Sequence, residues 1–447
     1  MAVWSEVALS EVELTRIDAE FYRPDYLAAK KAAGSRKLKA YGAAVLHPAE
    51  FTRRYTEVGH FVLLAQNNRD NRYDWSTKQR VAPGLLSLIS RNRLEFGDVT
   101  ITRSGANCGQ ASVIGIELEN EPVYACADLL ILRSESVDGH LISTYLNSSV
   151  GRLLLDRGAY GAAQPHIAPS YIKEIPFPAT LLSIELEVRQ LIIDSRKFAM
   201  ESDVQLAGAQ QILESALGLN KLTFQKPVGY VAQLSNIEVS RRFDPEHFFP
   251  AFSAFCASLP SSVALDPLSK HLQFCQRGKQ PVYAKTGLAV INSKHVQPNR
   301  VIREGNRFAL ANPVDDLQIR SGDTLINGTG RGTIGRTAPY ISDTPAVADN
   351  HVTILRSSSL DPAYLSLYLN SAAGQMQVEM HQRGTSGQLE LYPFDIRKFL
   401  VWPAPGELQR DLRDLYDKAT KAERESKRLL EQAKARVEQL IEAAVQP

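Results

Sequence analysis

The chain contains one long stretch of sequence twice, and this internal repeat constrains its fold more than any other feature. Short motifs recur in the same order, at offsets that stay between 221 and 228 residues. In chain order, the matching pairs are Tyr22–Asp25 with Phe243–Glu246, Tyr55 with Tyr283, Gly97–Val99 with Gly322–Thr324, Ile131–Ser134 with Ile354–Ser357, Tyr145–Ser148 with Tyr368–Ser371, and Arg157-Gly158 with Arg383-Gly384. Chance matches would not stay collinear over 447 residues. We therefore predict two copies of one domain, because this period is far too long for a solenoid unit.

Each copy ends in a segment with the periodicity of a long helix that packs on another helix. Apolar or small residues recur there at alternating steps of three and four, the a/d pattern of a coiled coil. The residues predicted to pair the helices are Val188, Leu191, Phe198 and Leu213 in the first and Leu412, Leu415, Leu429 and Leu440 in the second. Prolines precede both segments at equivalent points, so we expect antiparallel pairing with one domain at each end of a rod. The alternative is that each helix packs only on its own domain.

Within each copy, short β-like runs alternate with turns, and helix signals are fewer. The β-like runs are Phe61–Leu64, Val99–Thr102 and Leu129–Leu132, with counterparts at Val290-Ile291, Thr324–Ile326 and Val352–Leu355; the helix signals are Leu141–Arg157 and Ala363–Met380. They predict a mixed α/β (α+β) fold, with two similar globular domains joined by two long antiparallel coiled-coil helices in a pseudo-twofold arrangement. The expected boundaries are 1–180 for the first domain, 181–220 for the first helix, 221–405 for the second domain and 406–447 for the second helix.

The composition is typical of a globular protein from a reducing compartment. Apolar residues make up 44% of the chain and charged residues 22%. Its cysteines form no CxxC pair and have no histidine at zinc-ligand spacing, so we expect free thiols at Cys108, Cys126, Cys256 and Cys275. The N-terminus lacks the apolar core of a signal peptide, and no apolar run reaches the roughly 18 residues of a membrane span. We expect a cytoplasmic protein without membrane contact.

The net charge of only +2 hides two strongly basic stretches. Between Lys30 and Arg103 there are 14 Lys and Arg against 6 Asp and Glu, and between Lys270 and Arg336 there are 11 against 4. The two stretches occupy corresponding parts of the repeat. A basic face present in both copies favours contact with the phosphates of a nucleic acid. The alternative is a pair of solvated basic surfaces without a ligand.

Two kinds of loop within these stretches carry side chains suited to DNA: the polar loops Gln66–Tyr73 and Asn292–His295, and the glycine loops Arg103–Gly109 and Asn327–Gly332. Asn and Gln can bond adenine edges, Arg and Lys can bond guanine or phosphate, and glycine lets a backbone approach a phosphate closely. The predicted DNA-binding residues of the first copy are Arg53, Arg54, Asn67, Asn68, Arg69, Asn71, Arg72, Arg103, Ser104 and Asn107. Those of the second copy are Arg277, Lys279, Asn292, Lys294, Asn327, Thr329 and Arg331. The alternatives are Asx turns in the polar loops and plain tight turns in the glycine loops.

No set of residues in the sequence matches a known catalytic constellation. Asn312–Asp315 is the closest match to the Asn/Asp-Pro-Pro-aromatic motif of a DNA methyltransferase, and it lacks the second proline and the aromatic residue. Asp98 and Asp323 recur in the repeat without the Glu-x-Lys of a common nuclease, so we interpret them as turn-forming residues at strand starts. His166 and His351 are not at equivalent positions, and no HExxH is present. We expect no catalytic and no metal site.

Taken together, this pattern resembles the specificity (S) subunits of type I restriction-modification systems. The resemblance rests on the start motifs around Pro24 and Pro245, the Gly-Asp strands with their glycine loops, the Tyr-Leu-Asn-Ser motifs and the terminal heptads. It covers essentially the whole chain, and the ordered, duplicated set carries it, since no single motif is specific.

The resemblance implies a DNA-binding, non-catalytic specificity subunit with two target recognition domains. Each domain would read one half of a split double-stranded target, and the helices would set the gap and dock two methyltransferase (M) subunits. S-adenosylmethionine would be bound by those partners, and ATP and Mg by a restriction/translocase (R) subunit where one joins, so that this chain would bind no cofactor itself.

Two other functions remain open at the level of sequence. The first is the separate specificity subunit of a related two-part type II restriction enzyme. The second is an interaction scaffold that uses its coiled coil and has no DNA target.

Overall fold

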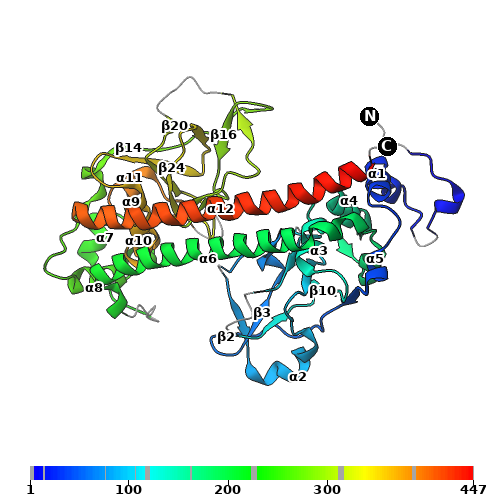
Figure 1. Cartoon of the computed structure of the whole chain (residues 1–447). Helices are drawn as coiled ribbons and strands as arrows, with labels where there is room; N and C mark the ends of the chain where they lie inside the picture. Colours follow the sequence, from blue (N-terminus) through cyan, green and yellow to red (C-terminus); the bar gives the residue numbers. More distant parts are fainter. Residues whose placement is uncertain are drawn as a thin grey trace. The chain divides into compact units, whose positions relative to one another are not determined.

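The computed structural model consists of two compact units that share two long helices. It describes residues 5–13, 16–75, 77–105, 107–115, 121–161, 164–222, 229–310, 317–384 and 389–445. The first unit is Met1–Met200 with Glu423–Pro447, and the second is Glu201–Ala422. Helix α6 (Glu185–Ala216) begins in the first unit and ends in the second, and α12 (Gly406–Val445) does the reverse (Figure 1). Among the described residues, no helix is both long and apolar enough to cross a membrane.

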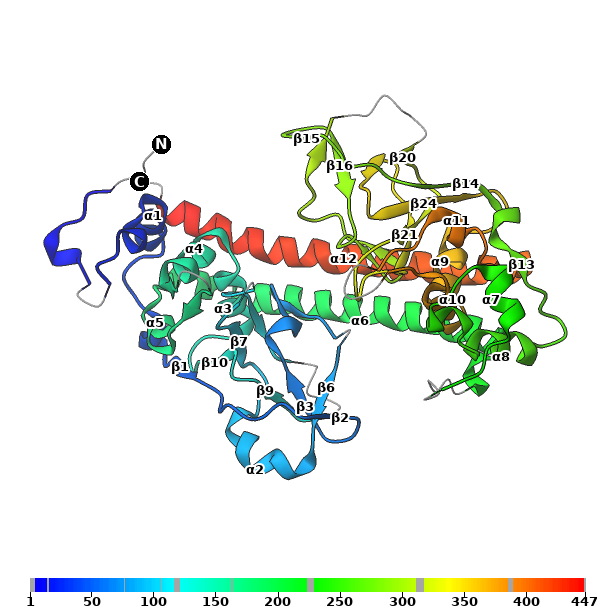
Figure 2. The ribbon, with the colours of Figure 1, turned by 180° about the vertical axis from the view of Figure 1, so that it is seen from behind.

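The first unit contains two four-stranded sheets flanked by short helices (Figure 2). The first sheet is antiparallel and has the order β1 (Ala44–Leu46), β10 (Leu129–Arg133), β7 (Val99–Thr102), β8 (Ala111–Val113). The second has the order β2 (Tyr55–Thr56), β6 (Gln79–Val81), β3 (His60–Leu63), β9 (Val123–Ala125), with β3 and β9 parallel. The unit also contains hairpins β4–β5 (Asn68–Arg69, Arg72–Tyr73) and β11–β12 (Ala159–Tyr160, His166–Ile167) and the α-helices α1 (Pro24–Ala32), α2 (Leu86–Ile89), α3 (Gly139–Leu146), α4 (Ser149–Gly158) and α5 (Pro169–Glu174).

The second unit repeats the strand order of both sheets and adds one strand, β20, at the edge of the second sheet. Its first sheet has the order β14 (Leu272–Arg277), β24 (Val352–Ser357), β21 (Asp323–Asn327), β22 (Thr337–Tyr340). Its second has the order β15 (Tyr283–Ala284), β19 (Phe308–Ala309), β16 (Leu288–Ile291), β23 (Ala346–Ala348), β20 (Gln318–Ile319). The other elements are hairpin β17–β18 (Val296–Gln297, Arg300–Val301), the pair β13–β25 (Asp266–Pro267, Leu400–Val401) and helices α7 (Leu234–Ser240), α8 (Ala251–Ser258), α9 (Pro362–Asn370), α10 (Ala372–His381) and α11 (Pro393–Ile396).

Even the register of the strands is the same in both units. Leu129 lies opposite Thr102 in the first, and their repeat partners Val352 and Asn327 lie opposite each other in the second. The mixed α/β fold and the duplicated domain are therefore confirmed. The pseudo-twofold relation and the four domain boundaries stay predictions.

The Tyr-Leu-Asn-Ser motif ends one helix and starts the next, so the predicted helical segment Leu141–Arg157 is divided between α3 and α4. Asn147 bonds both backbone groups of Ala111 on strand β8, and the Ser148 hydroxyl caps α4 by accepting from the Gly151 N–H. Asn370 makes the same pair of bonds to Thr337, so the predicted helix over Ala363–Met380 also divides in two. Because asparagine and serine bond backbone groups well, they favour helix ends over helix interiors.

Within each unit, α6 packs against α12. In the first unit Glu187 pairs with Arg436 at 2.8 Å, and the Ser195 hydroxyl donates to the Ser426 carbonyl at 2.8 Å. Residue numbers of the contacting partners increase along α6 while they decrease along α12, so the predicted antiparallel pairing is confirmed in this unit. The apolar residues of α6 and α12 share a core with the first sheet of each unit, through Val188, Ile192, Ala433, Val437 and Ile441 in the first unit and Ala209, Leu213 and Leu412 in the second.

The predicted pairing residues differ in their burial. Val188, Leu213 and Leu412 are fully buried and Leu429 nearly so, whereas Leu191, Phe198, Leu415 and Leu440 are half-buried. Near the end of α12, Val437 and Ile441 take the buried positions in place of Leu440. A straight helix drifts about 20° per heptad relative to a 3.5-residue repeat, which moves the buried face by one residue there.

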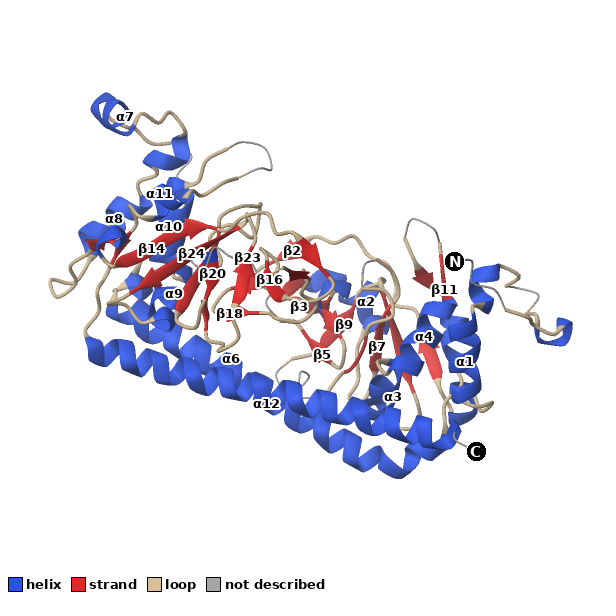
Figure 3. Ribbon diagram, turned by 90° about the horizontal axis from the view of Figure 1, so that it is seen from above, coloured by secondary structure: helices blue, strands red, loops and turns tan. Residues whose placement is uncertain are grey.

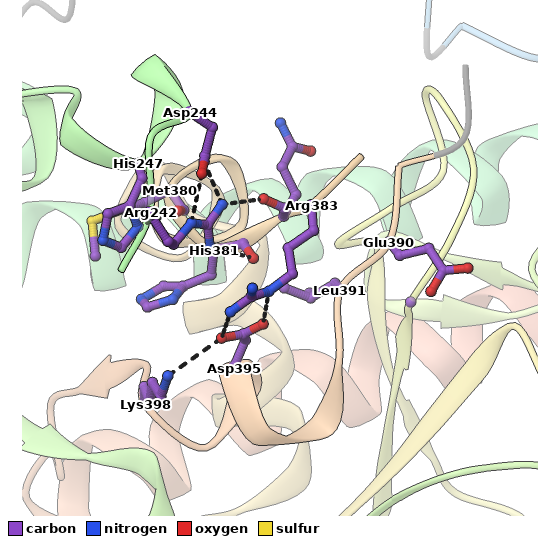
Figure 4. A network of polar contacts seen from close by, with 12 residues as sticks. Arg242, Asp244, His247, Met380, His381, Arg383, Glu390, Leu391, Asp395 and Lys398 are labelled. Carbon is purple, nitrogen blue, oxygen red and sulfur yellow. Dashed lines mark hydrogen bonds and ion pairs between the residues drawn. The ribbon is translucent and has the colours of Figure 1, made fainter. Parts of the chain in front are cut away.

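The start motif of the second unit is held by a buried arginine (Figure 4). Arg242 is 6% exposed, forms an ion pair with Asp244, and donates to the carbonyls of His381 and Gln382 at the end of α10. Beside it, Arg383 pairs with the buried Asp395 at 2.8 Å. The start motif and the Arg-Gly motif of the repeat thus meet in space, although about 140 residues separate them along the chain.

Candidate nucleic-acid interface

The glycine loops have the same construction in both units. Each follows the central strand β7 or β21, and Gly105 and Gly330 adopt left-handed φ angles of 90° and 97° that favour glycine. The Ser104 hydroxyl donates to the Asp128 carboxylate at 3.3 Å, and the Thr329 hydroxyl lies 2.7 Å from Nδ1 of His351.

Asp128 and His351 occupy one position of the repeat, directly before strands β10 and β24. In both units the hydroxyl of the glycine loop therefore contacts the residue at this repeat position. That residue is an aspartate in the first unit and a histidine in the second. Sequence reasoning missed both residues. Their place just before the matching Ile-Leu-Arg-Ser strands was the signal that could have found them.

In the first unit, Asp128 joins Arg53 to the glycine loop. Arg53 forms an ion pair with this carboxylate, which raises the pKa of the guanidinium, and its side chain remains 39% exposed. The backbone N–H of Arg103 donates to the Asp128 carbonyl at 2.8 Å, and Arg54 is exposed nearby in sequence. Arg53, Arg103 and Ser104, predicted from separate segments, are thus brought together. Asn107 lies half-buried within the same glycine loop.

In the second unit, Arg277 lies against the glycine loop. It donates to the carbonyls of Gly328 and Leu391 at 3.3 and 2.9 Å, and it pairs with Glu390 at 3.4 Å. Arg331 in the loop and Lys279 just after β14 are exposed. The loop, its hydroxyl and the cations again share one region of the unit.

Four of the predicted DNA-binding asparagines are corrected by the structure. They are buried and their amides are bonded within the protein, so they cannot reach a base edge in this conformation. Asn67 accepts from the Leu64 N–H, Asn68 donates to the carbonyls of Thr100 and Gln110, Asn71 donates to Thr144, and Asn327 donates to the carbonyls of Ser293 and Val296. Their exposures lie between 0% and 4%. They hold the polar loop to the sheet.

The other residues of the polar loops divide between turns and surface. Asn292 accepts from the Lys294 N–H at 3.2 Å in an Asx turn, the alternative that the sequence left open. Arg69 donates to the Asn68 carbonyl at 2.9 Å and pairs with Asp74. Arg72 and Lys294 are exposed.

The repeated acids Asp98 and Asp323 have a structural use. Asp98 accepts from the Glu95 N–H and pairs with Arg133, and Asp323 makes the equivalent bonds to the Arg320 N–H and Arg356. Both are almost fully buried at the start of a central strand. Their interpretation as turn-forming residues agrees with this geometry.

Within the described ranges, no group of three or more His, Cys, Asp or Glu side chains is placed to hold a metal ion. Burial raises the pKa of the Cys108 and Cys275 thiols to about 11, which keeps them protonated. The Asn312–Asp315 segment lies outside the described residues.

Comparisons with known proteins return solved structures. No family model and no curated protein matches the chain. A type I restriction-modification S subunit from M. genitalium is 12% identical, covers 92% of this chain and 96% of its own, and has a TM-score of 0.37. A structure of type I R-M complex assembly and conformational transition is 13% identical with coverages of 90% and 97% and a TM-score of 0.31. An HsdS subunit from Thermoanaerobacter tengcongensis is 12% identical, with coverages of 90% and 96% and a TM-score of 0.28.

Proposed function

We propose that this chain is the specificity subunit of a type I restriction-modification complex. Each unit reads one half of a bipartite DNA target, and the long helices set the gap between the halves. The observation that carries the proposal is that one basic, glycine-loop site is built twice on the same strand order and register. A split target with two unlike halves needs two similar sites with different side chains, as at Asp128 and His351.

The chemistry of such a complex belongs to its partners in this proposal. The chain acts without a catalytic site and binds no cofactor of its own. S-adenosylmethionine is held by two methyltransferase subunits docked on the helices, and ATP and Mg by a restriction subunit where one is present. The proposed setting is the cytoplasm, where such a complex meets DNA.

The test is to express the chain with the methyltransferase encoded beside it, in a host lacking DNA methylation, and to map modified bases across the genome. A split motif with two defined halves and a fixed gap is the expected result. Exchange of one globular unit for that of a homologue changes one half of the motif only. A stable complex with the methyltransferase that leaves the genome unmodified contradicts the proposal and favours the scaffold alternative.

A further inference from the structure

In the first unit, the polar hairpin β4–β5 is tied to the long helix α6 by a buried arginine. Arg196 of α6 is only 6% exposed, and no other charged residue of this helix is buried. Its guanidinium donates to the Asn71 carbonyl at 3.3 Å and to the Ser112 hydroxyl at 3.0 Å, and it lies 5.5 Å from the centre of the Tyr73 ring. One side chain therefore joins the helix to both the hairpin and strand β8.

The second unit makes the same connection in the opposite direction. Arg300 belongs to hairpin β17–β18, which lies beside α6 (Figure 3). Its guanidinium donates to the Ser202 hydroxyl at 3.1 Å and to the Asp203 carboxylate at 2.6 Å, both on α6. The arginine belongs to the helix in the first unit and to the hairpin in the second, but it links hairpin and helix in both.

Each hairpin is also fixed to the strand that follows the glycine loop. The hairpin turns at Asn71 and Asn299, which have left-handed φ angles of 55° and 60° and are nearly fully buried. The N–H of Asn71 donates to the Ala111 carbonyl at 2.9 Å, and that of Asn299 donates to the Thr337 carbonyl at 2.8 Å. Contacts therefore run without interruption from α6 through the hairpin to β8 or β22, and so to the glycine loop.

We propose that Arg196 and Arg300 are positioning residues that fix the orientation of each glycine-loop face on α6, and thereby make the protein intolerant of a wrong gap between half-sites. This inference rests on the proposed function. One base pair of B-DNA moves a half-site by about 3.4 Å and turns it by about 35° around the axis. A domain held rigidly on its helix cannot follow that displacement, whereas a loosely held domain can.

The test uses the complex with the methyltransferase and Arg196→Gln, Arg300→Gln and the double variant. Competition binding compares duplexes carrying the target at its natural gap and at one base pair more or less. We expect affinity for the natural gap to change less than threefold, while discrimination against the wrong gaps falls at least tenfold. Arg196→Lys, which keeps the charge, restores part of the discrimination. Lys197→Gln removes the neighbouring exposed charge of α6 and leaves discrimination unchanged.

A second measurement distinguishes failure of the proposed positioning role of Arg196 and Arg300 from failure of the proposed function. Hydrogen exchange of the free protein should rise at least tenfold in residues 65–75 and 111–113 of Arg196→Gln, with other parts of the first unit unchanged. The positioning role is contradicted if hydrogen exchange and discrimination between gaps are both unchanged in the variants. It is also contradicted if the variants lose the same affinity for every gap. If wild type binds no split target, the proposed function fails, and the exchange result alone then decides whether the tie exists.

Discussion

At the scale of the residue, a histidine and an asparagine do the same work in the two units. The Asn67 side-chain oxygen accepts from the Leu64 N–H at 3.0 Å, and Nδ1 of His295 accepts from the Asn292 N–H at 3.0 Å, at the equivalent position. A ring nitrogen can accept only while it is unprotonated. The second unit thus depends on a neutral histidine where the first uses an amide that does not titrate.

This difference predicts an acid sensitivity specific to the second unit. Burial and the nearby Lys294 lower the pKa of His295 to about 4, against a weaker opposing effect of Glu304. The unfolded ring takes up a proton near its ordinary pKa of about 6.5, so stability is complete above that pH and is lost as pH falls towards 4. The loss between pH 7 and 5 is about 1–2 kcal/mol, at about 1.4 kcal/mol for each unit of pKa difference.

The matched variant is His295→Asn, which places the residue of the first unit in the second. Urea unfolding at pH 7 and 5 should show that the variant loses about 1–2 kcal/mol less than wild type, since its amide keeps the bond at both pH values. The buried His381, whose pKa is also lowered to about 4, is present in both proteins and cancels in the comparison. An equal pH dependence in the two proteins would show that His295 is not the sensitive group.

Asp128 offers a second test at this scale, because it is an acid within a basic site. It pairs with Arg53 and accepts from Ser104, so it offsets part of the positive charge that the still exposed Arg53 presents to phosphate. We expect Asp128→Asn to raise non-specific DNA binding about three- to tenfold at low salt, and less as salt screens the charges. Fluorescence anisotropy with a random duplex measures this. The control Asp417→Asn, on α12 beside Arg413, should have no effect; equal gains in both variants would place the interface elsewhere.

Residue types alone could not separate DNA contacts from internal bonds. Asn68 and Asn327 have the chemistry of base readout, yet each donates to two backbone carbonyls inside its own unit. Both uses need the same amide, and burial, which decides between them, depends on which strands lie beside the loop. The glycine loops were predictable because their pattern is local, whereas their partners Asp128 and His351 lie more than 20 residues away in sequence, in the turns before β10 and β24.

At the scale of the element, periodicity was the reliable guide. Helices α6 and α12 lie within the predicted 181–220 and 406–447 segments, and β7 matches the predicted Val99–Thr102 run. A repeating pattern records which face of a helix is buried, whatever that face packs against. The division between α3 and α4 was missed because α3 ends where the Asn147 amide bonds the backbone of Ala111 on β8. No local sequence pattern reveals a partner so distant along the chain.

The helix pair itself should carry a large part of the stability. Leu412 is fully buried in the core that α12 shares with α6 and the first sheet of the second unit, so Leu412→Ala should lower the free energy of unfolding by about 2–5 kcal/mol. Leu186 on α6 is 77% exposed, and Leu186→Ala should change it by less than about 0.5 kcal/mol. Urea unfolding at neutral pH measures both. Similar small changes would mean that the helices contribute little to the folded state.

At the scale of the whole molecule, a net charge of +2 conceals two basic stretches with nearly equal surpluses of Lys and Arg. A protein that binds DNA through both releases counterions from both, so the slope of log affinity against log salt reflects the number of phosphates that the two units neutralise together. An interaction scaffold without a DNA target would show no salt-dependent DNA affinity that could be assigned to the two units. The salt dependence of DNA affinity therefore tests whether both units bind phosphate, without requiring knowledge of the target sequence.

The decisive variants remove two exposed cations from one unit at a time. Arg53→Ala/Arg54→Ala and Lys279→Ala/Arg331→Ala should each reduce the magnitude of the slope by about 0.9 for every phosphate that is no longer neutralised. The fourfold variant should show the sum, because separate sites act additively. Lys418→Ala/Lys421→Ala removes the same charge from the exposed surface of α12 and should leave the slope unchanged. If only one unit's variant lowers the slope, the repeat is a duplicated fold with a single DNA site; if neither does, the glycine-loop faces are not where phosphate is bound.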